Sequence, residues 1–313
     1  MSDTFDHPNL WKDETKTQGL KLFGCRVRPP EEGEEFFLAG QQVSTAGKTF
    51  RAWDAIRELL TGEDLFCEPQ ETGDCVAVSA ADLLEAIQLI EIWNGEAEDF
   101  HPIHASYLYA AGREGIGKGR LRGGAGSFGG WQAQAVAGKY GALRMDMQDV
   151  PKYSGKLSDA WGDGRKHKST SWHDWTEYAD DHQIRKTAYV KSWTQLVDAV
   201  ANGHLCTMAS DLAWEMKPRS DGFHRKRGSW AHQMGIWAIS DDRRKPWAGV
   251  HNNWGDVHGV VRDFETEENW PSGMIRARPD DLEAAFRNGE VIAWSGFDGF
   301  VDRRVDWEAW SLA

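Results

Sequence analysis

The sequence predicts an α+β fold in which a helical lobe is followed by a sheet lobe. Helical periodicity dominates the first half of the chain, and a period of two dominates the second half. The 313 residues can bury a full hydrophobic core, and no internal repeat divides them into smaller units. Helices and strands that are segregated along the chain are typical of the α+β class.

A long apolar helix is expected from Cys75 to Asn94-Gly95, where the glycine ends it. Its apolar side chains recur at helical spacing, at Val76, Ala80, Leu83, Leu84, Ile87 and Ile90. Because so much of this segment is apolar, we expect it to lie at the centre of the protein.

Two shorter helices are expected over 104–111 and 131–140, and the glycine-rich stretch 112–130 between them is interpreted as a flexible loop. Its segment GREGIGKG resembles a phosphate-binding loop, but Gly119 stands where the magnesium-binding hydroxyl would be. The stretch also does not follow a predicted strand, so we do not expect it to bind a nucleotide.

The second half begins with a polar segment and continues with strands. Residues 151–186 are charged and carry tryptophans, which indicates a long surface insertion. A helix over 192–202 follows. The expected strands are 205–210, 232–240 and 247–253, and a strand, a helix and a strand follow over 274–278, 279–289 and 290–297.

Composition excludes several functions. The 49 acidic and 36 basic residues give a net charge of −13, which argues against general nucleic-acid binding. No apolar run approaches the roughly 18 residues of a membrane span, and the first residues do not read as a secretory signal. We therefore expect a cytoplasmic or virion-associated protein without membrane contact. The four cysteines form no C-x-x-C pair, and we expect no metal and no cofactor.

Three residues on these elements have the chemistry of a nucleophilic hydrolase. Cys75 lies in the first turn of the long helix, where unpaired N–H groups favour a thiolate. His232 opens a predicted strand, and Asn252 ends the next one, where its amide can orient the imidazole. Each residue alone is more often a core thiol, a buried histidine or a turn asparagine. Together they form a complete set for covalent catalysis.

The motifs around these residues resemble those of the papain-like (C1-type) cysteine peptidases. Cys75-Val-Ala-Val-Ser79 matches the family's C-W-A-F-S at Cys, Ala and Ser, and Asn252-Asn253-Trp254-Gly255 matches its N-S-W-G. Three positions depart from the pattern. Gln70 lies one residue closer to the cysteine than the family's glutamine, Val76 replaces a tryptophan, and Asp74 replaces a serine.

The resemblance implies a role for each matched residue. It makes Cys75 the nucleophile, His232 the general acid and base, and Asn252 the residue that orients the histidine. It makes Gln70 the oxyanion donor. The residues that it assigns to substrate binding or to support of the triad are Trp254, which would shield the His–Asn hydrogen bond, the pair Gly129 and Gly130, which would line the cleft, and Trp230.

The resemblance also implies a two-lobe papain-like fold and a division of the chain. Residues 1–60, with Pro29-Pro30 and an acidic run at 31–35, would be an N-terminal extension, and its residues 1–50 could block the cleft. Residues 61–313 would be the catalytic domain. Its parts would be a helical lobe over about 61–150 carrying the cysteine, the insertion at about 151–186, and an antiparallel sheet or barrel lobe over about 187–313 carrying the histidine and asparagine.

The implied function is that of a cysteine hydrolase, most simply a peptidase that cleaves polypeptides. Segments such as ASYLYAAGR also resemble papain-like proteins encoded by bacteriophages. A peptidoglycan peptide and other virion proteins are therefore further expected partners, although the acidic composition favours a polypeptide substrate. The alternative is a catalytically weak or inactive structural or interaction protein of a virus particle that keeps the papain fold.

The 17 tryptophans divide into two expected groups. Those near the motifs are expected to line the cleft. Trp161, Trp172 and Trp175 lie in the polar insertion, and we expect them to present a partner or substrate surface.

Overall fold

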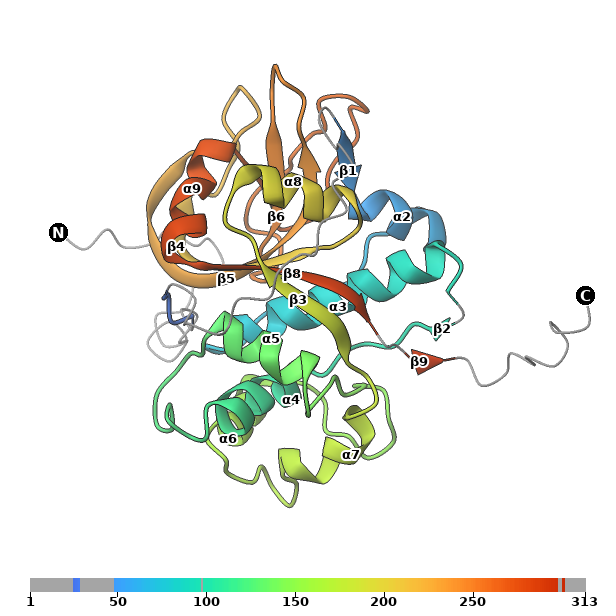
Figure 1. The fold of residues 1–313 in the computed structure, drawn as a ribbon, viewed down its shortest axis with the longest axis vertical. Helices are drawn as coiled ribbons and strands as arrows, with labels where there is room; N and C mark the ends of the chain where they lie inside the picture. Colours follow the sequence, from blue (N-terminus) through green and yellow to red (C-terminus); the bar gives the residue numbers. More distant parts are fainter. Residues whose placement is uncertain (1–24, 29–47, 97, 298–299, 302–313) are drawn as a thin grey trace, which may run out of the picture.

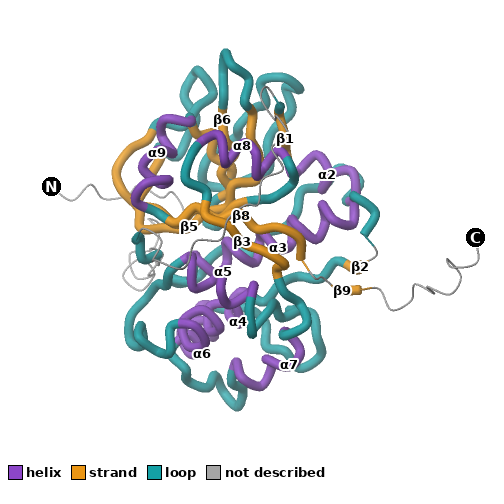
Figure 2. The backbone as a smooth tube through the Cα atoms, in the orientation of Figure 1, coloured by secondary structure: helices purple, strands orange, loops and turns teal. Residues whose placement is uncertain are grey.

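The computed structural model describes residues 25–28, 48–96, 98–297 and 300–301. Short helices gather in the lower lobe of Figure 1, and most strands gather with a few helices in the upper lobe. Figure 2 shows the same division by colour. The predicted two-lobe α+β class is therefore confirmed. The expectations for Pro29-Pro30 and the acidic run at 31–35 fall outside the described residues.

In chain order the elements are β1 (Thr49–Arg51), α2 (Ala52–Leu59), α3 (Cys75–Trp93), β2 (Glu98–Asp99), α4 (Ala105–Ala110), the π-helical turn η1 (Ala111–Ile116), α5 (Gly129–Ala137), α6 (Gly155–Gly162), the 3-10 turn η2 (Trp172–Trp175), α7 (Thr176–Ala179), β3 (Ile184–Tyr189), α8 (Trp193–Ala201), β4 (Cys206–Trp214), β5 (Lys226–Ser240), β6 (Trp247–His251), β7 (Met274–Ala277), α9 (Pro279–Asn288), β8 (Glu290–Phe297) and β9 (Phe300–Val301).

The helix α3 is the centre of the molecule. Every residue from Cys75 to Glu91 is buried, including the polar ones. Glu85 accepts a hydrogen bond from the backbone N–H of Ile103, and Glu91 accepts one from that of Phe297. These buried carboxylates tie α3 to the segment before α4 on one side and to β8 on the other. Neither α3 nor any other helix in the described part of the chain is long and apolar enough to cross a bilayer.

The tryptophans of 151–186 close the core of the helical lobe instead of forming a partner surface. Trp161 and Trp172 are fully buried, and Trp175 is partly buried against the same core. The ring of Trp172 packs edge-on against Tyr140, with 5.4 Å between the ring centroids. The expected partner surface is therefore wrong for Trp161 and Trp172. The otherwise polar segment 151–186 folds as α6, η2 and α7, and these elements enclose the two indole rings.

The glycine-rich stretch 112–130 is held by a buried arginine. The guanidinium of Arg113 donates to the backbone carbonyls of Leu121 and Gly162 and lies 2.9 Å from the carboxylate of Asp163. Its side chain is nearly inaccessible to solvent. The interpretation of this stretch as a flexible loop is therefore wrong, because the arginine satisfies carbonyls that glycines would otherwise leave unpaired.

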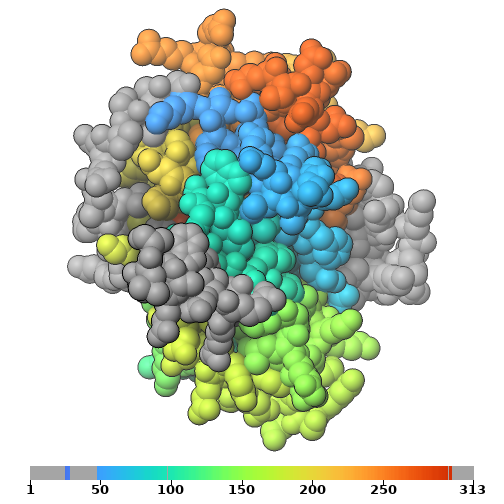
Figure 3. Space-filling view, turned by 90° about the vertical axis from the view of Figure 1, so that its right-hand side faces the viewer, coloured from blue at the N-terminus to red at the C-terminus, as the bar shows by residue number. Residues whose placement is uncertain are grey.

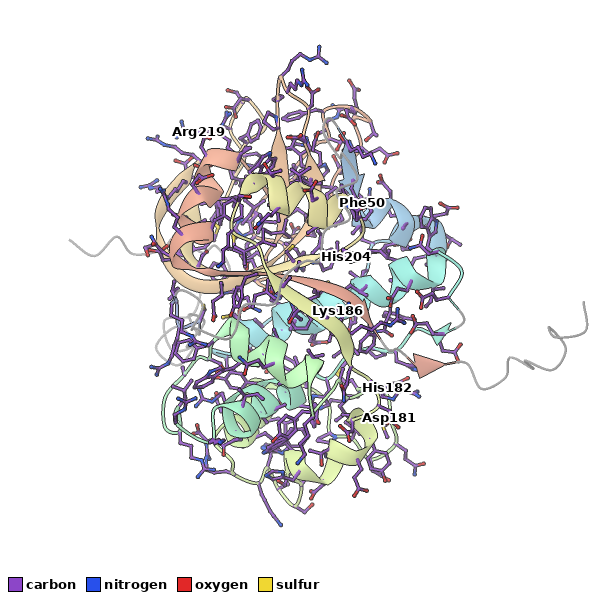
Figure 4. All side chains as sticks on the ribbon, in the orientation of Figure 1. Phe50, Asp181, His182, Lys186, His204 and Arg219 are labelled. Atoms are coloured by element: carbon purple, nitrogen blue, oxygen red, sulfur yellow. The ribbon has the colours of Figure 1, made fainter. Side chains whose placement is uncertain are left out.

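The main sheet has the strand order β3-β8-β4-β5-β6-β7, with β1 pairing with the end of β5, and every pairing is antiparallel. Figure 4 labels Phe50 on β1 and His204 just before β4 in the upper lobe. It also labels His182, which lies just before β3, and Lys186 within β3, and these mark the path from the lower lobe toward the sheet. The lobes thus share a continuous strand as well as the central helix.

The segment before α3 belongs to the folded body. Thr49 pairs with Ser240 and Arg51 with Ala238, and Ile56 of α2 is buried in the core that contains α3. In Figure 3 the blue residues of this segment lie between the orange part of the sheet lobe and the green part of the helical lobe. The structure therefore places Thr49–Leu59 inside the fold, whereas the sequence assigned 1–60 to an extension. A three-residue strand is too short to show a periodicity.

Candidate active site

The first residue of α3 is Cys75, and it is fully buried. Asp74 before it accepts the backbone N–H groups of Ala77 and Val78 on its own carbonyl oxygen, which begins the helix. The hydroxyl of Tyr153 donates to the Asp74 carboxylate at 3.1 Å. Burial raises the pKa of Asp74 to about 7, against the hydrogen bonds that lower it. The anion that the sequence places beside the thiol is therefore partly neutralised near neutral pH.

His232 on β5 and Asn252 just after β6 form a hydrogen bond in the sheet lobe. The imidazole Nε2 lies 2.8 Å from the Asn252 Oδ1, and both residues are buried. The Nδ2 of Asn252 lies 2.6 Å from the Nε2 of His258. Because the amide N–H donates to His258, the amide oxygen faces His232, and His232 must donate from Nε2.

The other ring nitrogen of His232 is left with a lone pair. Its Nδ1 is buried and makes no hydrogen bond within the described residues. Burial lowers the pKa of His232 to about 4, although the hydrogen bond to Asn252 opposes the shift. A neutral imidazole with a bare Nδ1 is the form that can take a proton from a thiol.

Trp254 covers this hydrogen bond. Its ring stacks on His232 with 4.6 Å between centroids and 29° between planes, and it contacts Trp230 at 5.0 Å. Both tryptophans are buried. Excluding water from the His232–Asn252 bond strengthens it electrostatically.

Backbone and side-chain hydrogen bonds join the two lobes beside these residues. The Nε2 of Gln233, the residue after His232, donates to the carbonyl of Val76, the residue after Cys75, at 2.9 Å. Gln70 donates its backbone N–H to the Asn253 carbonyl at 2.9 Å. The first bond joins the neighbour of His232 to the neighbour of Cys75, and the second joins Gln70 to the neighbour of Asn252. The start of α3 and the strands β5 and β6 are thus held together.

The Gln70 side chain lies at the same junction. Its Oε1 accepts from the Trp254 indole at 3.2 Å, and its Nε2 donates to the backbone carbonyl of Thr72. The structure thus brings Gln70 against the indole that covers His232. An amide N–H of Gln70 is directed at its own loop, so the oxyanion role remains a prediction.

A short piece of the N-terminal segment crosses the junction between the lobes. Cys25 donates its backbone N–H to the carbonyl of Ala231 on β5 at 3.2 Å, and Arg26 donates to that of Ser127 at 2.8 Å. Cys25 is buried, and the negative potential of Cys75 contributes to raising its pKa, after burial itself. Arg28 follows, so residues 25–28 bridge the helical and sheet lobes next to His232.

The glycine pair lies at a tight contact between α5 and the sheet. A side chain at Gly129 would come within 2.6 Å of the Gln233 Oε1, and one at Gly130 within 2.6 Å of the Tyr189 hydroxyl. Arg28 lies beside the pair, with its Nε 3.4 Å from the buried carboxylate of Glu290. Ser127, two residues earlier, carries the hydrogen bond to the N-terminal segment.

Sequence reasoning missed His258, Gln233 and Cys25. His258 lies in an irregular loop with no periodic pattern, and its link to Asn252 depends on loop geometry. The adjacency of Gln233 to His232 was the only available signal for that residue. Cys25 was visible as a cysteine, but nothing in its local sequence connects it with β5.

No protein-family model matches the sequence, and no curated protein matches it either. Solved structures do. Xylellain, a cysteine protease from Xylella fastidiosa, is 12% identical with a TM-score of 0.56, over 88% of this chain and 97% of that one. The proCathepsin B S9 of Trypanosoma congolense is 12% identical with a TM-score of 0.55, over 90% and 88%. Procathepsin L2 of the Tenebrio molitor larval midgut is 13% identical with a TM-score of 0.53, over 91% and 81%. Together with the lobes and strand order, these similarities show that the chain has the papain-like cysteine protease fold.

Proposed function

We propose that this protein is a cysteine peptidase that cleaves amide bonds with Cys75, His232 and Asn252. The observation that carries the proposal is the buried chain of hydrogen bonds from His232 through Asn252 to His258, which leaves the His232 Nδ1 as a lone-pair acceptor. The papain-like fold and the position of Cys75 at the start of α3 support it.

The proposed reaction begins with transfer of the Cys75 thiol proton to the Nδ1 of His232. The thiolate attacks the substrate carbonyl carbon, and the imidazolium protonates the leaving amine as the C–N bond breaks. Water, deprotonated by His232, then hydrolyses the thioester. The Cys75 backbone N–H and Gln70 are the proposed oxyanion donors, and one such donor contributes about 3 kcal/mol in comparable sites.

Activity requires residues 25–28 to leave the junction. The segment occupies backbone groups of Ala231 and Ser127, which flank the site. Its release would return water to His232 and so remove the burial that lowers the imidazole pKa. We therefore propose that the described arrangement is a latent form of the peptidase.

The nucleophile is tested on unfolded casein and with iodoacetamide, in the full-length chain that carries the segment-releasing Arg28→Glu change introduced below. We expect Cys75→Ala to lose at least about 10⁴-fold in activity and to lose the fast-labelling thiol. Cys206→Ala is the matched control, because Cys206 is buried in the sheet-lobe core and should leave both readouts unchanged. Full activity without Cys75 would overturn the proposal.

Latency is tested by reversing one charge in the segment. Arg28→Glu places a second carboxylate beside that of Glu290 and should raise activity by weakening the segment's attachment. Arg26→Glu makes the same charge change at an exposed side chain and is the control. Equal activities of the two variants would argue against latency by this contact.

The second candidate function is a structural or interaction protein of a virus particle with a papain-like fold. The occupied junction and the engaged amide of Gln70 favour it. If neither Arg28→Glu nor the unaltered chain cleaves casein or a peptidoglycan peptide, and Cys75 is not selectively alkylated, this second function is preferred. Phage origin and other virion partners belong to this candidate.

A further inference from the structure

A separate cluster of side chains lies behind the candidate active site. Cys67 precedes α3, Asp82 lies in the middle of α3, and His251 ends β6. One donor atom from each, a thiol sulfur, a carboxylate oxygen and an imidazole nitrogen, all lie within 4.8 Å of one another. The three residues come from both lobes and from the connecting segment, so no local sequence motif predicts the cluster.

The spacing is close to that of a tetrahedral zinc site. Zinc bond lengths of about 2.0–2.3 Å place neighbouring donors about 3.3–3.8 Å apart. The His251 Nδ1 and the Asp82 Oδ2 are already 3.8 Å apart. A contraction of about 1 Å or less would bring the remaining donor pairs into range.

Each donor is positioned by its surroundings and has spare coordinating capacity. The His251 ring stacks on Trp237 at 4.4 Å and 23°, is nine-tenths buried, and forms no hydrogen bond through its nitrogens within the described chain. The Oδ2 of Asp82 accepts from the Asn253 amide at 2.8 Å. Among hydrogen bonds within the described ranges, the Cys67 sulfur makes only a long one of 3.8 Å to the Leu65 carbonyl.

The electrostatics of the cluster favour a cation. No lysine or arginine pairs with Asp82 among the described residues. One thiolate, one carboxylate and a divalent ion sum to zero charge, which removes the cost of burying either anion alone.

A cavity of about 240 Å³ adjoins the cluster and leaves room for a fourth ligand. Cys67 and His251 line it, together with Asn252 and Asn253. The described residues that line this cavity include no lysine or arginine. A water molecule or a small anion could therefore complete a tetrahedron from the cavity side.

We propose that Cys67, Asp82 and His251 form a zinc site, with the fourth position open to this cavity. Thiolate, imidazole and carboxylate donors together select zinc over magnesium or calcium, which prefer oxygen alone. Binding breaks the S–H bond of Cys67 and the O–H bond of Asp82 where it is protonated. The protons pass to solvent, Zn–S and Zn–O bonds form, and no atom changes oxidation state.

The site would act on the segment that carries Asn252. His251 precedes Asn252 directly, and Asn253 follows it and binds Asp82. A bound ion would thus anchor the end of β6 to α3 on both sides of the residue that orients His232. The proposed role is to hold the two lobes in register at the active site, as a structural site does.

The test uses the full-length Cys75→Ala protein, because this variant removes the other Cys–His pair that could take up zinc. After chelation and dialysis, zinc content is measured by mass spectrometry, and Co²⁺ is titrated as a spectroscopic probe. We expect about one zinc per chain and the visible and thiolate charge-transfer bands of a tetrahedral cobalt ion. Zinc should also raise the thermal midpoint.

Variants in the same background locate the site. Cys67→Ser and Asp82→Asn should weaken zinc binding by about 100-fold or more, beyond the loss caused by a merely supporting partner. Cys67→Ser should also abolish the charge-transfer band. Cys206→Ala is the matched thiol control and should retain both. Failure of the parent to bind zinc, or equal binding by all variants while circular dichroism shows them folded, would overturn the proposal without bearing on peptidase activity.

Discussion

The two halves of the candidate active site are held together by different forces. In the sheet lobe, His232, Asn252 and His258 are linked by hydrogen bonds between uncharged groups, and Trp254 stacks over them. In the helical lobe, buried carboxyl groups lie along α3 and at Asp74, the residue before it. The pKa of His232 is lowered to about 4, whereas that of Asp74 is raised to about 7.

Burial causes both shifts, and it favours the neutral form in each case. The consequence differs because burial moves the pKa of His232 below the physiological range but moves the pKa of Asp74 into it. His232 keeps its neutral form throughout the physiological pH range, so the function of the sheet half should depend on the geometry of its hydrogen bonds and not on pH. Asp74 changes its charge near neutral pH, so the helical half should respond to pH.

The largest expected effect comes from the aromatic packing that supports the helical half. Trp161→Ala should lower the free energy of unfolding by about 3–5 kcal/mol, because the indole is fully buried. Urea denaturation measures this change. Trp93→Ala, at a side chain that is 48% exposed, is the control and should cost far less. A loss below about 1 kcal/mol for Trp161→Ala would contradict the described packing.

The next effect is the pH dependence that Asp74 gives to stability. Its carboxyl holds a proton up to about pH 7 in the folded protein, but only up to about its ordinary pKa of 3.8 when unfolded. At a pH between these two pKa values, folding therefore takes up a proton, and the stability of the folded protein falls as the pH rises through this range. The contribution is fully present below the lower value and lost above the upper one.

Asp74→Asn should remove this part of the pH dependence. Relative to the unaltered protein, the variant should gain up to about 4 kcal/mol between pH 4 and pH 8. Denaturation curves at several pH values measure the difference, in which the titration of other buried acids cancels. Parallel stability profiles for the two proteins would show that Asp74 does not titrate as described.

A smaller effect is expected when the sheet-lobe half of the candidate site loses the side-chain amide of Asn252. Asn252→Ala removes the hydrogen bond that sets the tautomer of His232, and kcat/KM on casein should fall by about 100-fold. The thermal midpoint is followed in parallel to separate this loss from unfolding. Unchanged kcat/KM in a folded variant would remove Asn252 from the mechanism.

The smallest effect is expected at His258, which positions Asn252 without facing the substrate. His258→Ala should lower kcat/KM by about 10-fold and alter its pH profile, because the amide loses its acceptor. His258→Gln offers an amide oxygen at a similar reach and should restore most of the activity. Equal losses in both variants would point to packing instead of positioning.

Much of the architecture was readable from local pattern. The long helix from Cys75 was predicted and confirmed, and so were the strands around His232 and before Asn252. The helix after Ser192 was also predicted, and its cap is the Ser192 side chain. Apolar periodicity and capping residues act over a few positions, which is why they can be read directly. The phage resemblance remains a prediction.

The errors arose where a residue is stabilised by distant parts of the chain. Trp161 and Trp172 lie in polar surroundings along the sequence, but the fold encloses them. The glycine-rich stretch looked flexible because Arg113 also binds partners outside it, the Gly162 carbonyl and the Asp163 carboxylate. Composition describes the neighbours of a residue in sequence, and these partners are neighbours only in space.

By itself, the sequence determined the class of the fold and its central helix, and it suggested the three residues of the candidate mechanism. The tertiary structure decided what surrounds them: His258 behind Asn252, residues 25–28 between the lobes, and the donor cluster of Cys67, Asp82 and His251. The physical reason is that periodicity and motifs encode short-range geometry, whereas burial, pKa and coordination depend on atoms that only folding brings within a few ångströms.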